Sequence, residues 1–250
     1  LGSFLTKVKA SSDQRAKMAA LTGDLRLAQR RKPRKGKDEI VLPDEFHPIS
    51  KPRNTVEYRN AANYLKKRGI LREDILRYNI GYCEDGDYAY HIIIPSYDAD
   101  GKLNFFMGRR YYESEGVIPH KKPECEMNLV GFESFINYNE PLNLCEGAFD
   151  AIAIRNNAVP LFGKYPSKKL CSKMIIHGTK QVNMVLDDDA YKDAIKNYRI
   201  LKNRVPNVEV RLVRLGGKDP SSLGFIKTHE TIRNARPFDE TDFMKFKLGL

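Results

Sequence analysis

From Pro141 onward, short apolar segments alternate with longer amphipathic ones, and this alternation constrains the fold more than any other feature. The predicted strands are 142–145, 159–162, 181–186 and 208–215, and the predicted helices are 148–156, 167–177 and 191–204. Strands that alternate with helices form parallel sheets, because each helix returns the chain to the same edge. We therefore expect a four-stranded parallel sheet flanked by helices, with ligands bound beyond the carboxyl ends of its strands.

Acidic residues follow three of these predicted strands. Asp187 and Asp189 are two apart after the third strand, so they share a face, and Asp188 points elsewhere. Taken singly, such acids are common in solvated loops and helix caps. Because they follow neighbouring strands, we expect these acids to form one cluster. A cluster of carboxylate oxygens without His or Cys suits Mg²⁺ or Mn²⁺, which are hard cations. The expected metal ligands are Glu146, Asp150, Asp187, Asp189 and Asp219.

The segment before the alternating region predicts a small α+β unit. Helices are expected at 55–68 and 72–78, and the first ends at Gly69. A β-hairpin follows, with strands at 90–95 and 103–110 and a turn at 98–101. At the other end of the chain, Asp219 followed by Pro220 is typical of a helix start.

The charge of the chain favours a polyanionic partner. Lys and Arg exceed Asp and Glu by 43 to 32, which gives a net charge of +11. Seven of these cations lie within 26–37, either as a solvated surface run or as a phosphate-contacting arm. No stretch approaches the roughly 20 apolar residues of a membrane span. We therefore expect no membrane partner.

The cysteines and the first residues bear on location. The four cysteines include no C-x-x-C pair, and no secretory signal precedes them, so we expect reduced thiols and a cytoplasmic protein. The chain begins at Leu1 without an initiator Met, which suggests a fragment of a longer protein.

Two sets of motifs resemble one known family. The run Leu-Cys-Glu-Gly-Ala-Phe-Asp-Ala at 144–151, followed by Val-Leu-Asp-Asp-Asp at 185–189, resembles the Toprim domain of DnaG-type primases, topoisomerases and some nucleases. Upstream, the segments 64–70, 80–82, 94–110 and 129–132 resemble the N-terminal subdomain of bacterial and phage primase cores, in the same order. The resemblance covers residues 55 to about 223. The chain is thus similar to a bacteriophage-like DnaG-type DNA primase.

The resemblance implies an organisation in four parts. Residues 1–53 would be a basic linker, with Leu1–Leu5 as the end of a zinc-binding module, and 54–138 an α+β primase subdomain. Residues 139–218 would be the Toprim domain, and 219–250 a C-terminal helical segment. Zinc is expected only if such a module belongs to the native protein. A phage-encoded protein would act in the host cytoplasm.

The implied activity is nucleotidyl transfer in DNA replication. The enzyme would make short RNA primers from ribonucleoside triphosphates on a single-stranded DNA template, with Mg²⁺ or Mn²⁺, and a replicative helicase is a possible partner. Glu146, Asp187 and Asp189 would be catalytic, with Asp150 and Asp219 as further metal ligands. Ser221 stands where the family often has a further acid.

Basic residues would bind nucleic acid or nucleotide phosphates. The candidates are Arg109, Arg110, Lys121 and Lys122, and aromatic residues interleave with them at 105, 106, 111 and 112. Such rings either stack on unpaired bases or belong to the core. Two other functions stay open: a Toprim-family metal-dependent nuclease, and a non-catalytic adaptor that binds single-stranded DNA. A topoisomerase is disfavoured because the chain is too short for strand-passage domains.

Overall fold

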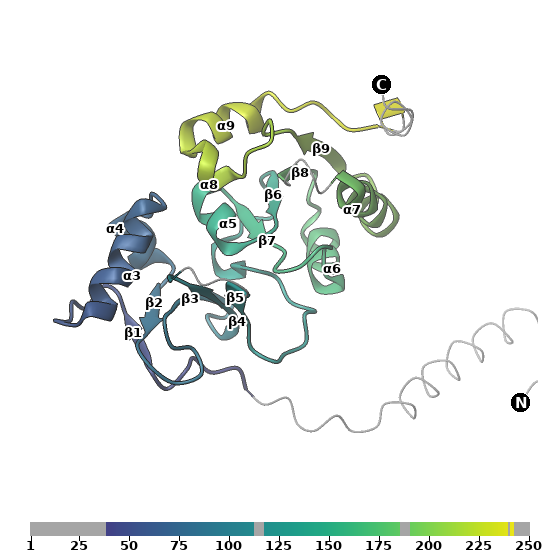
Figure 1. Ribbon diagram of the computed structural model, residues 1–250. Coiled ribbons are helices and arrows are strands. Elements are labelled where there is room, and N and C mark those ends of the chain that lie inside the picture. The colour runs from purple at the N-terminus through teal and green to yellow at the C-terminus, as the bar shows by residue number, and fades with distance from the viewer. Residues whose placement is uncertain (1–38, 113–117, 186–190, 240, 243–250) are drawn as a thin grey trace, which may run out of the picture. The chain divides into compact units, whose positions relative to one another are not determined.

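The computed structural model describes residues 39–112, 118–185, 191–239 and 241–242 (Figure 1). By its contacts the chain divides after Glu39, and Ile40–Leu250 forms one compact unit. The basic run at 26–37 and the acids at 187–189 lie outside the described residues. Two sheets with their helices make up the compact unit.

The first sheet is antiparallel, with the strand order β1-β2-β3-β4-β5. Its strands are β1 (Phe46–Pro48), β2 (Gly81–Cys83), β3 (His91–Tyr97), β4 (Leu103–Arg110) and β5 (His120–Lys121). Strands β3 and β4 form the predicted hairpin, and the Asp98 side chain holds its turn by accepting hydrogen bonds from the backbone of Asp100 and Lys102. Strand β1 lies upstream of residue 54, so the sheet begins earlier than the sequence pattern indicates.

Two helices accompany this sheet. Helix α3 (Val56–Lys67) begins where the Thr55 side chain accepts a hydrogen bond from the Tyr58 N–H. Gly69 follows the C-cap residue Arg68 and stops the helix, because its φ of 70° is the left-handed conformation that glycine adopts readily. The N–H groups of Gly69 and Ile70 then satisfy carbonyls of the last turn, and α4 (Arg72–Arg77) follows.

The second sheet is parallel throughout, which confirms the predicted fold class. Its strands are β6 (Leu142–Cys145), β7 (Ala158–Pro160), β8 (Gln181–Val185) and β9 (Glu209–Val213), and its helices are α5 (Ala148–Ile154), α6 (Lys168–His177) and α7 (Tyr191–Arg204). The strand order is β7-β6-β8-β9. From β6 the chain goes to β7 on one side of it and then crosses to β8 on the other side. Parallel sheets bind ligands at the carboxyl ends of the strands where the strand order reverses in this way.

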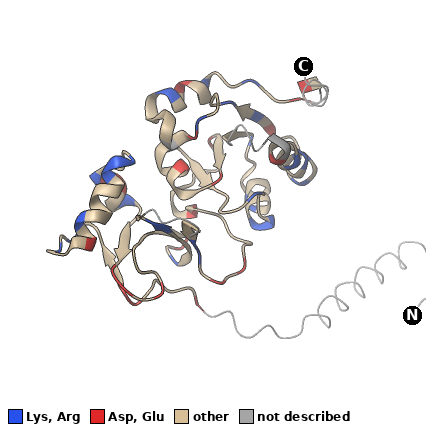
Figure 2. Cartoon of the chain, viewed as in Figure 1, with Lys and Arg blue, Asp and Glu red and all other residues tan. Residues whose placement is uncertain are grey.

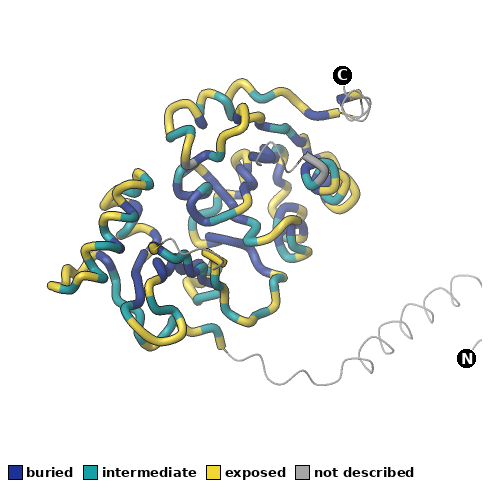
Figure 3. Tube along the Cα trace, in the orientation of Figure 1, coloured by how far each residue is buried: buried dark blue, intermediate teal, exposed yellow. Residues whose placement is uncertain are grey.

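Helices cover both faces of the parallel sheet. On β8, Val182 and Met184 pack in the cluster that contains residues of α6 and α7, whereas Val185 packs in the cluster that contains α5. This alternation follows from the pleat, because successive side chains on a strand point to opposite faces. Figure 3 shows the strands buried and the exposed residues on the outer sides of the helices.

One apolar cluster joins the two sheets. It contains Ile80, Tyr82 and Ile92 of the antiparallel sheet region together with Ala148 and Ile152 of α5. The connecting segment contributes Phe132, just before a short 3₁₀ helix, η1 (Glu133–Phe135). The two sheets of the compact unit therefore share a core.

The C-terminal part contains the expected short helices. Helices α8 (Pro220–Leu223) and α9 (Phe225–Arg233) follow β9. The expectation of helix throughout 219–250 is wrong for 234–239, because this stretch pairs with the exposed edge of β9: Pro237 bridges Arg211, and the Phe238 N–H donates to the Val210 carbonyl at 2.8 Å.

Two further expectations concern membranes and cysteines. Within the described ranges, no helix is both long and apolar enough to cross a membrane. None of the four cysteines, all within the described ranges, forms a disulfide, and Cys83, Cys145 and Cys171 are buried. Burial raises the pKa of the Cys83 thiol to about 12, so that it packs as a small apolar group.

Candidate active site

A cavity of about 610 Å³ lies between the parallel sheet unit and strands β4 and β5. One wall carries acids from the ends of the parallel sheet unit, and the opposite wall carries bases from β4, β5 and the end of α3. Its charged and polar lining residues are Arg68, Arg109, His120, Lys121, Lys122, Glu146, Asp150 and Asp219. Six of the predicted site residues are thus brought together in one cavity.

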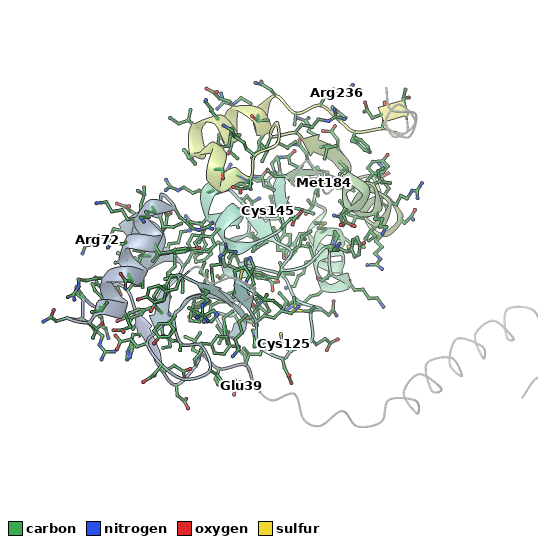
Figure 4. All side chains as sticks on the ribbon, in the orientation of Figure 1. Glu39, Arg72, Cys125, Cys145, Met184 and Arg236 are labelled. Carbon is green, nitrogen blue, oxygen red and sulfur yellow. The ribbon has the colours of Figure 1, made fainter. Side chains whose placement is uncertain are left out.

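Glu146 is placed by the backbone of the neighbouring strand. Strand β6 ends at Cys145, which Figure 4 labels, and Glu146 is the next residue. The parallel pairing continues past the end of β7: the N–H groups of Leu161 and Phe162 donate to the carbonyls of Cys145 and Glu146, at 2.9 and 3.0 Å. The Glu146 side chain is exposed at the cavity.

Asp150 has a capping role as well as a place in the cavity. Gly147 is the N-cap of α5, and its N–H donates to Asp150 Oδ2 at 3.1 Å. A carboxylate in the first turn also interacts favourably with the helix dipole. Asp150 is therefore both a helix-capping acid and a residue that lines the cavity.

Asp219 also both caps a helix and lines the cavity. Its Oδ1 accepts a hydrogen bond from the Ser222 N–H at 2.7 Å, which makes it the N-cap of α8, with Pro220 at the first helical position. The predicted helix start is confirmed. Because α8 packs against α5, this cap lies at the same cavity as Asp150.

The basic wall follows the alternation of β4. Phe105, Met107 and Arg109 are two apart and line the cavity. Arg110 does not line it: its guanidinium lies 6.0 Å from the centre of the Tyr90 ring. Sequence proximity groups Arg109 with Arg110, but the strand places their side chains on opposite faces.

Arg109 is held by two partners. Its Nε donates to the Tyr64 hydroxyl at 3.1 Å, and its Nη1 contacts His120 Nε2. Desolvation, together with the charges of Arg109 and Arg68, lowers the pKa of His120. The ring is therefore neutral at pH 7 and can accept the hydrogen bond, which fixes the guanidinium at the cavity wall.

The other two predicted bases also line the cavity. Lys121 donates to the Asp87 carbonyl, and its ammonium lies 4.6 Å from the centre of the Tyr88 ring. Lys122 is exposed. Figure 2 shows Lys and Arg along β4 and on the α3–α4 helices, while acids lie at the start of α5.

Sequence reasoning missed Arg68 and His120. Arg68 follows α3 and lies over the rings of Tyr64 and Phe149, at 5.2 and 4.8 Å from their centres. It stands inside the segment 64–70 that resembles primases, but only the packing of α3 against α5 brings it to the acids. His120 lies beside the predicted lysines without any metal-ligand spacing that would single it out.

The remaining predicted acids lie outside the described residues. Strand β8 ends at Val185, two positions before Asp187, and β8 is the direct neighbour of β6. Leu144 pairs with Met184, which Figure 4 labels beside Cys145. The roles of Asp187 and Asp189 stay predictions.

The donor chemistry of the acidic wall suits a hard divalent cation. Glu146, Asp150 and Asp219 offer carboxylate oxygens at one cavity, the ligand type that Mg²⁺ and Mn²⁺ prefer. Among the residues that the structure describes, no three His, Cys, Asp or Glu are close enough to form a metal-binding group. The described acids would therefore need further ligands to complete such a site.

Comparisons of the sequence with known proteins assign the chain to no family. No protein-family model matches the chain. The chain is 29% identical over 164 residues to the uncharacterized protein MG010 of Mycoplasma genitalium. The matched region covers 62% of this chain and 74% of that protein.

Solved structures define the class of fold. The zinc-binding and RNA polymerase domains of Aquifex aeolicus primase match with a TM-score of 0.64 and 19% identity over 75% of this chain and 58% of that one, so this chain spans less than two thirds of its length. A DnaG primase catalytic domain bound to single-stranded DNA matches with a TM-score of 0.60 and 19% identity over 74% of each chain. The protein has the fold of DnaG primase catalytic cores.

Proposed function

We propose that this protein is a primase-type nucleotidyltransferase with a Toprim catalytic domain, which joins ribonucleotides on a single-stranded DNA template. One observation carries the proposal: on the fold of DnaG primase cores, a single cavity has carboxylates at the carboxyl end of β6 on one side and cations of β4 and β5 on the other. A polyanionic substrate would need the basic wall, and the metal cations that accompany it would need the acidic wall.

The basic wall would hold phosphates. Arg109, fixed by Tyr64 and His120, presents a planar guanidinium that can bind two phosphate oxygens at once. Lys121 and Lys122 add point charges to the same wall. These residues would orient the triphosphate or the template backbone and offset part of its charge.

The acidic wall would serve the reacting groups. In the proposed reaction, the 3′-hydroxyl oxygen bonds to the α-phosphorus of the incoming nucleotide, the bond from this phosphorus to pyrophosphate breaks, and the hydroxyl proton passes to water. Glu146 is the carboxylate that we place nearest the reacting phosphate, with Asp150, Asp187, Asp189 and Asp219 as further ligands of Mg²⁺ or Mn²⁺. Such ions, when bound, stabilise charge on the attacking and leaving oxygens.

The test is incorporation of radiolabelled ribonucleotides on mixed-sequence single-stranded DNA with Mg²⁺ or Mn²⁺, with template integrity followed in the same gel. We expect short RNA products, and Glu146→Gln should lower their rate by about 10² to 10³, as for loss of other preorganised electrostatic groups. Glu140→Gln, at an exposed turn away from the cavity, is the matched control.

Three outcomes separate the candidate functions. RNA products that vanish in Glu146→Gln support the primase. Template cleavage that vanishes in the same variant would contradict the primase proposal and identify the protein as a nuclease. DNA binding without either product, or RNA synthesis unchanged in Glu146→Gln, would contradict the proposed role of this cavity.

A further inference from the structure

A second cavity of about 610 Å³ lies beside α3 and the residues that follow β4. Tyr64 lines this second cavity, and its hydroxyl accepts a hydrogen bond from the Nε of Arg109, which lines the first. The second cavity thus adjoins the basic wall of the first. Its lining residues are Asn60, Asn63, Tyr64, Lys66, Lys67, Tyr111 and Tyr112.

One face of α3 supplies its polar side. Asn60, Asn63, Tyr64 and Lys67 are spaced i, i+3, i+4 and i+7, which places them on one face of a helix, whereas Leu65 belongs to the buried core. Asn63, Lys66 and Lys67 are exposed.

The charge of this cavity is positive and uncompensated. Neither Lys66 nor Lys67 forms an ion pair with any residue that the structure describes. No Asp or Glu occurs among the described lining residues. An anionic ligand would therefore meet two lysines and no opposing carboxylate.

Tyrosines supply the other side. The rings of Tyr90, Tyr111 and Tyr112 pack against one another, with the Tyr112 ring centre 4.9 Å from that of Tyr111 and 5.3 Å from that of Tyr90. Tyr112 nevertheless stays 37% exposed, and its hydroxyl is the acceptor for the Asn60 side-chain amide. The Tyr111 hydroxyl is buried and has no hydrogen-bond partner among the described residues.

We propose that this second cavity binds an unpaired nucleobase and its adjoining phosphates, as part of a single strand that also passes the basic wall of the first cavity. A fixed, partly exposed ring is a surface on which any base can stack, the amides of Asn60 and Asn63 can meet base edges, and Lys66 and Lys67 can meet phosphates. The inference rests on the proposed function, because it takes the ligand to be the template strand.

The stacking contact can be tested by fluorescence anisotropy with a labelled dT oligonucleotide and an abasic oligonucleotide of equal length. Tyr112→Ala should weaken binding of dT about tenfold and leave binding of the abasic strand nearly unchanged. Tyr112→Phe keeps the ring and loses only the hydroxyl, so it should bind dT like the wild type.

The phosphate contact can be tested by salt dependence. Lys67→Gln should reduce the slope of log K against log salt by about 0.7, the contribution of one phosphate contact on a single strand. Lys227→Gln, an exposed lysine of α9 that lines neither cavity, changes the charge equally and should leave the slope unchanged.

The outcomes separate this inference from the proposed function. Equal binding of dT by wild type and Tyr112→Ala, with an unchanged slope in Lys67→Gln, would overturn the second cavity as a nucleic-acid site, even if primer synthesis still depends on Glu146. Absence of any binding to single-stranded DNA would also overturn the inference about the second cavity. The incorporation assay would then test the proposed function of the first cavity independently. Thermal melting of each variant shows whether the fold is retained.

Discussion

At the scale of single residues, the candidate site combines groups that are fixed with groups that are exposed. Tyr64 and His120 fix the Arg109 guanidinium, and Gly147 fixes Asp150, whereas Glu146 has its backbone held and its side chain at the cavity. Groups that are oriented before the substrate arrives need little reorganisation during the reaction. The arrangement therefore fits the electrostatic role on phosphates that we propose for this cavity.

His91 gives a prediction about pH. The residue is buried on β3, and its Nδ1 lies 2.7 Å from the Ala89 carbonyl, which makes Nδ1 the protonated nitrogen. Burial lowers the pKa of His91, so the unfolded chain binds the proton more readily than the folded one. The free energy of unfolding should therefore fall as the pH drops through about 6.5, the ordinary pKa of histidine.

The measurement is the melting temperature between pH 7.5 and 5.5. We expect His91→Asn, which retains a donor near Nδ1, to show a smaller decrease over this interval than the wild type. His177→Gln, an exposed position on α6, serves as the control. An equal decrease in His91→Asn and wild type would show that His91 is not responsible.

At the scale of elements, the regular pattern was predictable and the contacts between distant segments were not. The parallel strands, the hairpin and the caps at Thr55 and Asp219 follow from local periodicity and turn chemistry, and their bounds agree with the structure to within about two residues. Strands β1 and β5 are too short for an alternation of apolar and polar residues to be visible in the sequence. Arg68 reaches the site only because α3 packs against α5, which no local pattern encodes.

Gly131 shows why one such contact constrains the sequence. A Cβ at this position would lie 2.2 Å from the carbonyl oxygen of Pro160, at the end of β7. Because the obstructing atom belongs to the backbone, Gly131→Ala should lower the free energy of unfolding by about 1–3 kcal/mol, as overpacked sites do. Denaturant unfolding measures this change.

The matched control is Gly163→Ala, where the nearest atom to a new Cβ would be 3.9 Å away. We expect its effect to be below about 0.5 kcal/mol. If both variants unfold at the same denaturant concentration as the wild type, the close approach of 131 to β7 does not exist in solution.

At the scale of the whole molecule, an ion pair adjoins the shared core. Arg155, at the end of α5, donates from Nη2 to Asp74 Oδ2 of α4 at 2.9 Å. The Asp74 side chain is 7% exposed and also accepts the Leu71 N–H. Arg155→Ala would leave this buried carboxylate without its cation, and should lower the free energy of unfolding by about 1–3 kcal/mol.

A double-mutant cycle with Asp74→Asn isolates the pair. The coupling between the two substitutions should be about 1 kcal/mol or more, because each removes the same interaction. Additive effects would mean that the two side chains stabilise their own helices and do not couple the two parts of the molecule.

The shared core also limits how such a protein can be cut or recombined. Ile152 and Ala148 of α5 are covered by the cluster that holds Ile80 and Ile92, so a parallel sheet grafted onto a foreign N-terminal unit would leave them in water. Natural or engineered exchange of one sheet therefore requires a compensating surface on the other. The acidic and basic walls of the first cavity thus stand on two sheet regions that share one apolar core.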